Sequence, residues 1–216
     1  MYIHTNVNYD LNNLKTTLEN ILMKIIDCFT FYNELEMLKY RLNVLNDIVD
    51  YFIIVESTHT QMGYEKKLYF DENKDLFLNF KDKIIHIIVD DVKHKQPNVD
   101  VSKGEQWVNE NHQRNCIKRG LDKIMLEDKD VIAITDLDEI PDRNTLLHIK
   151  TSNEQINVFS LEQDMYYYNL NTRCQNKWYK SKIISYKRFK DSNLTCNDIR
   201  MRENHTIIKN GGWHLS

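Results

Sequence analysis

Glycine and proline are scarce in this chain of 216 residues, which contains 5 glycines and 2 prolines. Disordered and low-complexity segments are usually rich in these residues, so the composition argues against long segments of that kind. Apolar residues make up 41% of the chain, which is enough for a sizeable core. The length suits one domain, or one domain with an appendage.

Cysteine is also infrequent, and its spacing is uninformative for metal binding. The four cysteines are Cys28, Cys116, Cys174 and Cys196, and no two of them form a CxxC pair. The usual spacing of a zinc site is therefore missing. A disulfide framework is not expected in a chain of this length, and we predict four reduced thiols, as in a cytosolic protein.

The sequence lacks an excess of positive charge and a long apolar run. The formal net charge is -3, with lysine and arginine spread along the chain, so we expect no nucleic-acid partner. No stretch is apolar enough to span a bilayer, and the polar N-terminus does not resemble a signal peptide. We therefore expect a cytoplasmic protein without a membrane span, and the oligomeric state stays open.

Strands and helices alternate through the first part of the chain. The apolar runs at 24–29, 49–58, 84–91 and 130–138 predict strands, and residues 9–24, 33–47 and 105–126 have helical spacing. A loop with a short helix is expected at 66–83, and another helix at 141–150. Strands that are apolar throughout are covered on both faces, which predicts an α/β fold with a mainly parallel sheet between helices.

The pattern changes after residue 155. Residues 156–171, 177–189 and 205–216 alternate more loosely, as antiparallel strands do. We therefore predict a helical extension at 1–23 and a single domain at 24–216. That domain would contain a nucleotide-binding half at 24–150 and a smaller, antiparallel acceptor-side half at 151–216.

One acidic cluster follows the fourth apolar run, in the sequence VIAITDLDEIPD at 131–142. In open α/β sheets, ligands bind outside the carboxyl ends of the strands. Asp136 and Asp138 are two residues apart, so both side chains can face one point while Leu137 returns to the core. Two adjacent carboxylates repel each other unless a cation lies between them. The cluster therefore predicts Mg²⁺ or Mn²⁺ that holds a phosphate or diphosphate.

Two other interpretations of the cluster are open. It can be a solvated acidic loop in which Asp142 helps to cap the following helix. The segment also resembles the nucleophile strand of haloacid-dehalogenase phosphatases, which continues as DxDx(T/V). In this chain, however, Glu139 and Ile140 stand at the last two positions of that pattern, and the strand is about the fourth instead of the first.

Five separate segments together resemble glycosyltransferase family 17. They are the segment at 27–66, NHQRNCIKRGL at 111–121, ITDLDEIPD at 134–142, MYYYNLN at 165–171 and NGGWHLS at 210–216. The family includes the β-1,4-mannosyl-glycoprotein N-acetylglucosaminyltransferases. The resemblance implies a GT-A (Rossmann-like) fold and an inverting transfer from a nucleotide-sugar, usually UDP-linked. It also implies Mn²⁺ or Mg²⁺ bound at the DxD motif.

The resemblance also implies roles for residues around this motif. Asp138 would coordinate the metal, and Asp136 would contact the metal, a metal-bound water or the donor ribose. His214 resembles a late histidine that supplies a further metal ligand, and the two glycines before it would let the backbone approach closely. Glu139 would orient the sugar or waters near the metal.

Further residues are expected to bind the donor or to act on the acceptor. Thr30, Phe31, Glu56 and Ser57 follow the first two strands and would contact the uridine. Arg114 would approach the uridine or the diphosphate from its helix.

On the acceptor side, the tyrosines at 166–168 would line the acceptor site. Asp164 is the candidate base that would deprotonate the acceptor hydroxyl.

The donor and acceptor are defined only by class. The donor would be UDP-GlcNAc, UDP-glucose or another UDP-hexose, and the acceptor a glycan or another compound with a hydroxyl group. Eukaryotic relatives carry a membrane anchor, whereas this chain resembles a cytosolic form of the kind found in bacteria or large DNA viruses. The acceptor of the eukaryotic enzymes is therefore not transferred to it. A module that binds a nucleotide-sugar or a carbohydrate without turnover is the alternative from another class.

Overall fold

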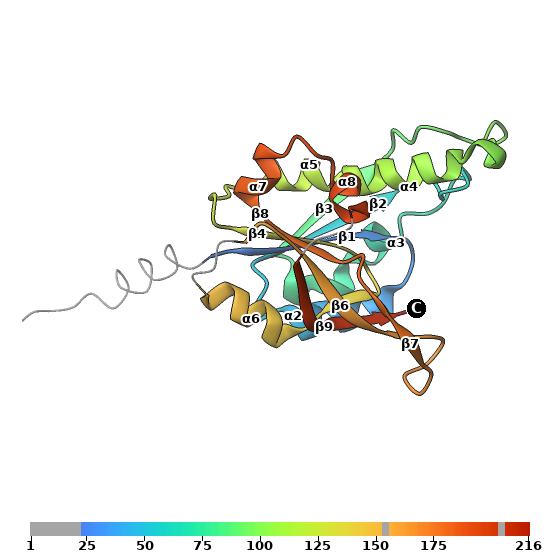
Figure 1. Cartoon of the computed structure of the whole chain (residues 1–216). Coiled ribbons are helices and arrows are strands. Elements are labelled where there is room, and N and C mark those ends of the chain that lie inside the picture. Colours follow the sequence, from blue (N-terminus) through green and yellow to red (C-terminus); the bar gives the residue numbers. More distant parts are fainter. Residues whose placement is uncertain (1–22, 153–155, 203–205) are drawn as a thin grey trace, which may run out of the picture.

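The structure is a computed structural model that describes residues 23–152, 156–202 and 206–216. The helical extension predicted at 1–23 lies outside the described residues, apart from Met23. Figure 1 shows one central sheet with helices on both of its faces. The sheet continues from the first half of the chain into the second, in the order β3-β2-β1-β4-β8-β6-β9-β5, with β7 paired to β6.

Four strands of this sheet are parallel, as the apolar runs predict. They are β1 (Ile25–Phe31), β2 (Tyr51–Ser57), β3 (Ile84–Val89) and β4 (Val131–Asp136). The register of β1 and β4 pairs Thr30 with Asp136. The end of the acidic strand therefore lies beside the end of β1 at the carboxyl edge of the sheet.

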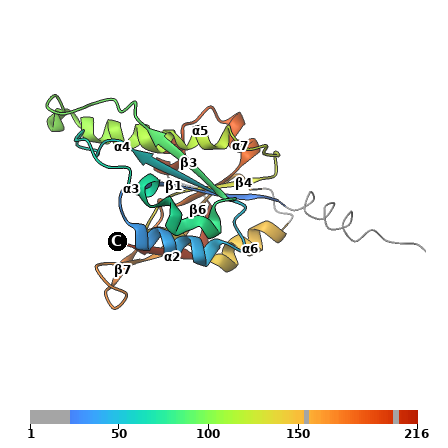
Figure 2. The same cartoon turned by 180° about the vertical axis from the view of Figure 1, so that it is seen from behind.

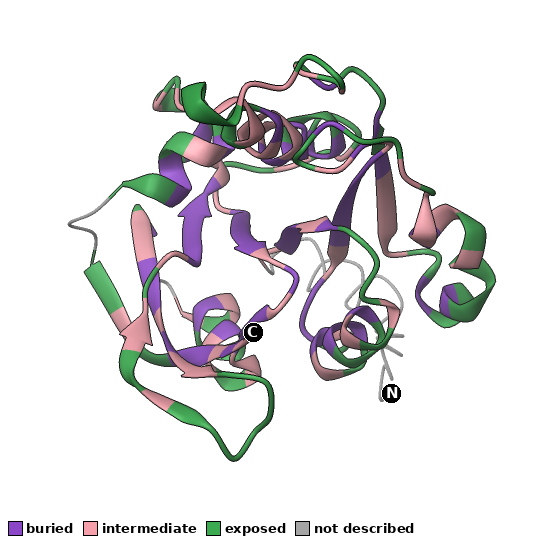
Figure 3. Cartoon of the chain, turned by 90° about the vertical axis from the view of Figure 1, so that its right-hand side faces the viewer, coloured by how far each residue is buried: buried purple, intermediate pink, exposed green. Residues whose placement is uncertain are grey.

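Helices cover both faces of these strands (Figures 1 and 2). One face carries α2 (Leu35–Leu45) and α6 (Arg143–Thr151), and the other carries α4 (Glu105–Asn115), α5 (Ile117–Leu121), α7 (Tyr186–Asp191) and α8 (Cys196–Met201). Three short helices lie in connections: α3 (Tyr69–Asn73), η1 (Lys74–Phe80) and η2 (Val101–Lys103). Each face has its own apolar core, and Figure 3 shows the buried residues concentrated in the strands and in the inner sides of the helices.

The helix predicted at 105–126 is two helices, α4 and α5, with Cys116 between them. Trp107 is 57% exposed, whereas the buried side chains of α4 are those of Asn109 and Arg114. In α5, a Cβ on Gly120 would lie 2.5 Å from Cγ2 of Ile53. The glycine lets α5 approach β2 closely, and the polar inner side of α4 faces the site described below.

The second half of the sheet is mixed. Its strands are β5 (Glu139–Pro141), β6 (Val158–Tyr166), β7 (Arg173–Trp178), β8 (Lys182–Ser185) and β9 (Thr206–Leu215). The pairs β4·β8, β6·β8, β6·β7 and β5·β9 are antiparallel, as expected, but β6 and β9 are parallel. Two short helices that the sequence pattern did not indicate, α7 and α8, carry the chain from β8 to β9, and this crossover makes the parallel pairing possible.

Two further features concern the cysteines and the helices. The four cysteines are all free thiols. No helix within the described ranges is long and apolar enough to cross a bilayer.

Candidate active site

A cavity of about 630 Å³ opens at the carboxyl ends of β1 and β4. Thr30 and Phe31 of β1 line it together with Gln113 of α4 and with Asp136 and Asp138 after β4. The loop after β2 contributes residues 59–62, and the end of β9 contributes Leu215 and Ser216. The volume is in the range of small-molecule sites, and the position is where open α/β sheets bind ligands.

Two arginines hold the carboxylate of Asp136. Arg114 of α4 donates to Oδ1 at 3.1 Å, and Arg200 of α8 donates to Oδ2 at 2.6 Å. Arg114 is itself held by Glu110 at 2.8 Å. A guanidinium is bound to each of its oxygens, so Asp136 anchors α4 and α8 at the edge of the cavity, which it also lines.

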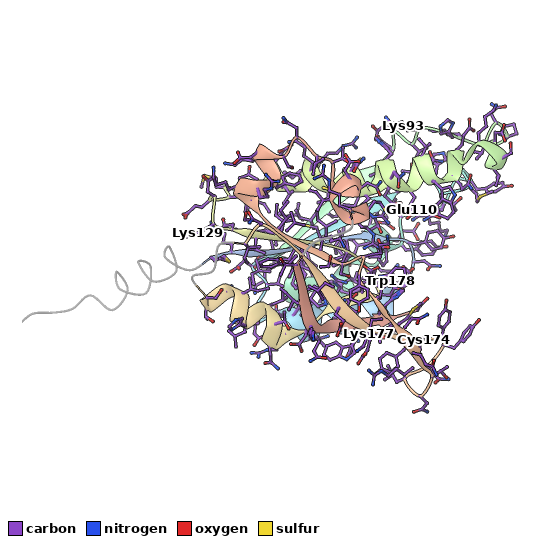
Figure 4. All side chains as sticks on the ribbon, in the orientation of Figure 1. Lys93, Glu110, Lys129, Cys174, Lys177 and Trp178 are labelled. Carbon is purple, nitrogen blue, oxygen red and sulfur yellow. The ribbon has the colours of Figure 1, made fainter. Side chains whose placement is uncertain are left out.

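Glu139 is fully buried beneath Asp136 and is saturated with hydrogen bonds. Arg200 donates to both of its oxygens at 2.6 Å, Ser181 donates at 2.8 Å and the backbone N–H of Asp136 at 3.0 Å. Trp178 of β7 donates to it as well. Figure 4 labels Glu110 of α4, which binds Arg114, and Trp178 of β7, which donates to Glu139.

The charges of this network fix the protonation of Glu139. Burial alone would raise the pKa of Glu139, but the hydrogen bonds and the charge of Arg200 outweigh it and lower the pKa to about 2. Since its carboxylate is buried and occupied, Glu139 organises the site from below and does not reach the cavity as the sequence interpretation expected.

The turn that carries Asp136 and Asp138 is held from the other face of the sheet by Arg41 of α2. Nη1 of Arg41 donates to three backbone carbonyls, those of Asp136 and Leu137 at 2.9 Å and that of Glu139 at 3.0 Å. Its Nε and Nη2 donate to the two oxygens of Asp27 at 2.8 and 2.6 Å. Both side chains are 0% exposed, so a buried ion pair sets the backbone of the acidic turn.

Asp138 lines the cavity and is paired with His214. Oδ2 of Asp138 lies 3.3 Å from Nε2 of His214, which comes from β9. The antiparallel pairing of β5 and β9 brings the histidine here, and the backbone N–H of Leu215 donates to the carbonyl of Asp138 at 2.9 Å. The pairing is close because residue 212 is glycine: a Cβ at Gly212 would lie 2.1 Å from the carbonyl oxygen of Ile140.

The Asp138–His214 pair fits a divalent cation. Two ligand atoms that bind one ion at right angles, each about 2.1 Å from it, are roughly 3 Å apart. This is close to the 3.3 Å between Oδ2 of Asp138 and Nε2 of His214. Burial would lower the pKa of His214, but its hydrogen bond to Asp138 and the nearby carboxylates outweigh this and raise it. Nδ1 of His214 is buried and has no hydrogen-bond partner in the described structure. A cation shared with Asp138 would bind Nε2, which faces that carboxylate, and the ring packs against Trp178 with centroids 4.6 Å apart.

The residues predicted to bind the nucleotide separate into two groups. Thr30 and Phe31 line the cavity, and Arg114 reaches its edge through Asp136. Glu56 and Ser57 are buried and do not line it. Glu56 is bound to His86 at 3.1 Å and to the backbone N–H of Phe70 at 3.1 Å, so it fixes the connection after β2. Ser57 accepts from the backbone N–H of His59 at 3.1 Å and shapes the loop that does line the cavity.

Asp164, the candidate base, lies outside the lining of this cavity. Its carboxylate is bound by Arg173 at 2.7 Å and by Lys177 of β7. Burial acts against ionisation of Asp164, but these two cations outweigh it and hold its pKa below the usual range. The geometry gives Asp164 a role in joining β6 to β7.

Sequence reasoning missed Arg41 and Arg200. Arg200 is 64 residues from Asp136 in the sequence, and nothing in its neighbourhood marks it. Arg41 did have a signal: it lies on the apolar face of its helix with Leu38, Leu42 and Leu45, all of which are buried. Asp27, an acidic residue inside an otherwise apolar strand, was the matching signal for its partner.

The fold and this site define a class of protein. The α/β architecture, with four parallel strands in a mixed sheet, is that of GT-A glycosyltransferases. A mannosyltransferase from Pyrobaculum calidifontis, solved with GDP-mannose and Mn²⁺, is similar to this chain with a TM-score of 0.50 and 10% identity, over 89% of this chain and 56% of that one. This likeness concerns the fold alone.

The sequence comparison identifies the family. Glycosyltransferase family 17 matches residues 3–216, and the chain belongs to this family. Among curated proteins, the β-1,4-mannosyl-glycoprotein 4-β-N-acetylglucosaminyltransferases of Rattus norvegicus and Homo sapiens are 28% identical to it over 131 residues, or 59% of this chain. The matched part is 23% of the rat protein and 24% of the human protein, so the match spans about a quarter of the length of these relatives.

Proposed function

We propose that this protein is a metal-dependent, inverting glycosyltransferase that transfers a hexose or N-acetylhexosamine from a UDP-sugar to a hydroxyl group. Membership of glycosyltransferase family 17 supports the reaction class. The observation that carries the proposal is the pairing of Asp138, which lines the cavity at the carboxyl edge of the sheet, with His214 at 3.3 Å. UDP-GlcNAc is the first donor to test, because the curated relatives are named as N-acetylglucosaminyltransferases.

Each part of the site has a place in this reaction. Asp138 and His214 would hold Mn²⁺ or Mg²⁺, which offsets negative charge on the departing diphosphate. Thr30 and Phe31 would form the wall against the nucleoside. Arg114, Arg200 and Arg41 keep the acidic turn fixed before the donor arrives, so little reorganisation is needed when it binds.

The phosphatase alternative has less support. A haloacid-dehalogenase phosphatase would use Asp136 as its nucleophile, and here Arg114 and Arg200 each bind one of the two oxygens of that carboxylate. The family match also covers nearly the whole chain. A binding module without turnover keeps the same site, so only an activity measurement separates it from an enzyme.

Calorimetric titration of UDP, with and without Mn²⁺, tests the donor site. Wild type should bind UDP in an Mn²⁺-dependent manner, and Asp138→Asn should weaken this binding at least about tenfold, since it removes a metal ligand. Asp82→Asn is the matched control, because it makes the same chemical change at an exposed position that does not line the cavity. Absence of UDP binding under all conditions would refute the donor assignment.

Release of UDP from UDP-GlcNAc and UDP-glucose then separates an enzyme from a binding module. If the protein is an enzyme, wild type should release UDP from the UDP-sugar in the presence of Mn²⁺. The Asp138→Asn variant should release none. A protein that binds UDP with Mn²⁺ and releases no UDP from any UDP-hexose would be the binding module.

A further inference from the structure

Three side chains that can bind a metal meet where the chain leaving β3 approaches the junction of α4 and α5. They are Asp91, which follows β3, His112 of α4 and Cys116, which lies between the two helices. Their ligand atoms all lie within 4.8 Å of one another, and no other three histidine, cysteine or acidic side chains in the described ranges are as close. None of the three lines the cavity of the candidate active site. We call them the helix-junction cluster.

Helical spacing and sheet topology together assemble the helix-junction cluster. The backbone N–H of Cys116 donates to the carbonyl of His112 at 3.1 Å, so the two residues are neighbours on one face of a helical turn. Asp91 follows β3, the strand at the margin of the sheet, and Arg119 of α5 donates to its Oδ2 at 2.7 Å. No CxxC pair marks the cluster, because one of its members comes from a different element of the fold.

The thiol and the carboxylate both approach the same nitrogen of His112. Sγ of Cys116 lies 3.9 Å from Nε2, and Oδ2 of Asp91 lies 3.3 Å from it. A catalytic Cys–His–Asp relay needs the thiol and the carboxylate on opposite ring nitrogens, so this arrangement does not suit an activated nucleophile. Three ligand atoms that converge on one point suit a shared cation instead.

The ligand types select zinc. Zn²⁺ binds thiolate, imidazole and carboxylate in a tetrahedron, whereas Mg²⁺ and Mn²⁺ prefer oxygen ligands. With bonds of about 2.3 Å to sulfur and about 2.0–2.1 Å to nitrogen and oxygen, neighbouring ligand atoms are about 3.4–3.6 Å apart. The separations of 3.9 and 3.3 Å at Nε2 of His112 lie within a few tenths of an ångström of these values. Rotation of the Asp91 carboxylate would bring it to the thiol, from which it is at most 4.8 Å away.

The surroundings give an ion both access and shelter. The side chain of Asp91 is 46% exposed and that of His112 is 15% exposed, whereas Cys116 is 3% exposed. An ion can therefore enter beside Asp91 and lose its water on the side of the thiol. Arg119 shares Asp91, but an ion pair between side chains that are 41% and 46% exposed stabilises the protein little and can yield to a metal. Zinc binds the thiolate, so binding would release the thiol proton to solvent.

We propose that the helix-junction cluster is a second metal site, specific for Zn²⁺, with Asp91, His112 and Cys116 as its protein ligands. A water molecule would complete the tetrahedron. The ion would tie the end of β3 to the junction of α4 and α5. The site is separate from the Asp138–His214 pair in its position and in the metal that it selects.

The position of the site connects it to the active-site cavity through α4. Gln113 lines that cavity and donates to the carbonyl of Val55 at 2.9 Å, and Arg114 binds Asp136. Both residues lie between His112 and Cys116 in the sequence. Zinc would therefore fix the helical turn that presents these two side chains, and its expected effect is on stability.

Spectroscopy with Co²⁺ tests the ligand set, because Co²⁺ occupies tetrahedral zinc sites and shows a thiolate charge-transfer band only where a cysteine binds it. Wild type with reduced thiols should develop this band, and Zn²⁺ should abolish it by displacement. Cys116→Ser should lack the band. Cys174→Ser is the matched control, because Cys174 is a half-buried thiol of β7 outside the cluster, and this variant should keep the band. Asp138→Asn should keep it too, since the donor metal binds elsewhere.

Affinity and stability give a second measurement. Asp91→Asn changes an exposed side chain, so the variant should fold, and it should bind Zn²⁺ at least about tenfold more weakly in competition with Co²⁺. Thermal unfolding is compared between Asp138→Asn and Asp138→Asn/Cys116→Ser, so that the other candidate site is disabled in both. At about a hundred times its dissociation constant, Zn²⁺ should raise the melting temperature of the first by roughly 5–10 °C and leave the second nearly unchanged.

Several results would overturn the proposal: absence of the charge-transfer band in wild type, a band of full intensity in Cys116→Ser, or its loss in Cys174→Ser. Equal Zn²⁺ affinity of Asp91→Asn and wild type would overturn the three-ligand assignment. The proposed glycosyltransferase function is tested independently. If wild type shows the band but binds no UDP with Mn²⁺, the zinc site stands and the donor assignment is wrong.

Discussion

Replacing Arg41 by methionine should destabilise the protein severely and disorganise the acidic turn. The substitution keeps an unbranched side chain of similar length but removes the guanidinium. Asp27 would then be a buried carboxylate without its partner, and the carbonyls of Asp136, Leu137 and Glu139 would lose their donor. Breaking a buried ion pair from one side costs about 3–5 kcal/mol. A domain is stable by only about 5–15 kcal/mol, so a large part of the stability would be lost.

Denaturation in urea measures this effect on three variants. Lys39→Met is the matched control, since it removes an exposed positive charge from the same helix and should change the free energy of unfolding by less than about 0.5 kcal/mol. The double variant Arg41→Met/Asp27→Leu removes the uncompensated charge as well. It should recover about 1–3 kcal/mol relative to Arg41→Met, because an apolar pair can replace a buried ion pair.

The double variant also tests the functional part of the argument. It should fold and yet bind UDP with Mn²⁺ more weakly than wild type, because no cation fixes the three carbonyls of the turn. A loss of less than about 1 kcal/mol in Arg41→Met would contradict the assigned role of the ion pair in stability. Wild-type UDP affinity in a folded double variant would show that Arg41 does not position the turn.

Three further predictions concern other parts of the site. Gly212→Ala should lower the melting temperature more than Gly104→Ala, because both residues have positive φ but only at Gly212 would the new Cβ meet a backbone oxygen, at 2.1 Å. His214→Ala should weaken Mn²⁺-dependent UDP binding at least about tenfold. His148→Ala, at an exposed position in α6, is the control and should bind UDP as wild type does. Equal UDP affinities of the two variants would show that His214 is not a metal ligand. Asp164→Asn should reduce the free energy of unfolding by less than about 1 kcal/mol at pH 7. The folded pKa of Asp164 is depressed, so its contribution is present above the unfolded pKa and is lost as pH falls through the folded value. Unfolding measured at pH 7 and pH 3 should therefore show the two proteins converging, and a difference that grows toward pH 3 would contradict the sign.

Local sequence determined much of the fold. The apolar runs identified β1, β2, β3 and β4 as parallel strands, because a strand buried on both faces has few alternatives to a parallel sheet between helices. The same reasoning placed Asp136 and Asp138 at the carboxyl edge. The resemblance in five segments then indicated the family, and the glycines before His214 indicated a close approach of two backbones.

Only the tertiary structure decided which groups these carboxylates meet. Arg200 and Arg41 reach Asp136 and its turn from 64 and 95 residues away, and no local pattern encodes such a distance. The same contacts decided that Glu139 and Asp164 are occupied by cations instead of facing the cavity. They also decided that Glu56 is buried with His86. A carboxylate can bind a metal, a substrate or an arginine, and its choice depends on which charges the packing of distant elements brings within hydrogen-bond distance.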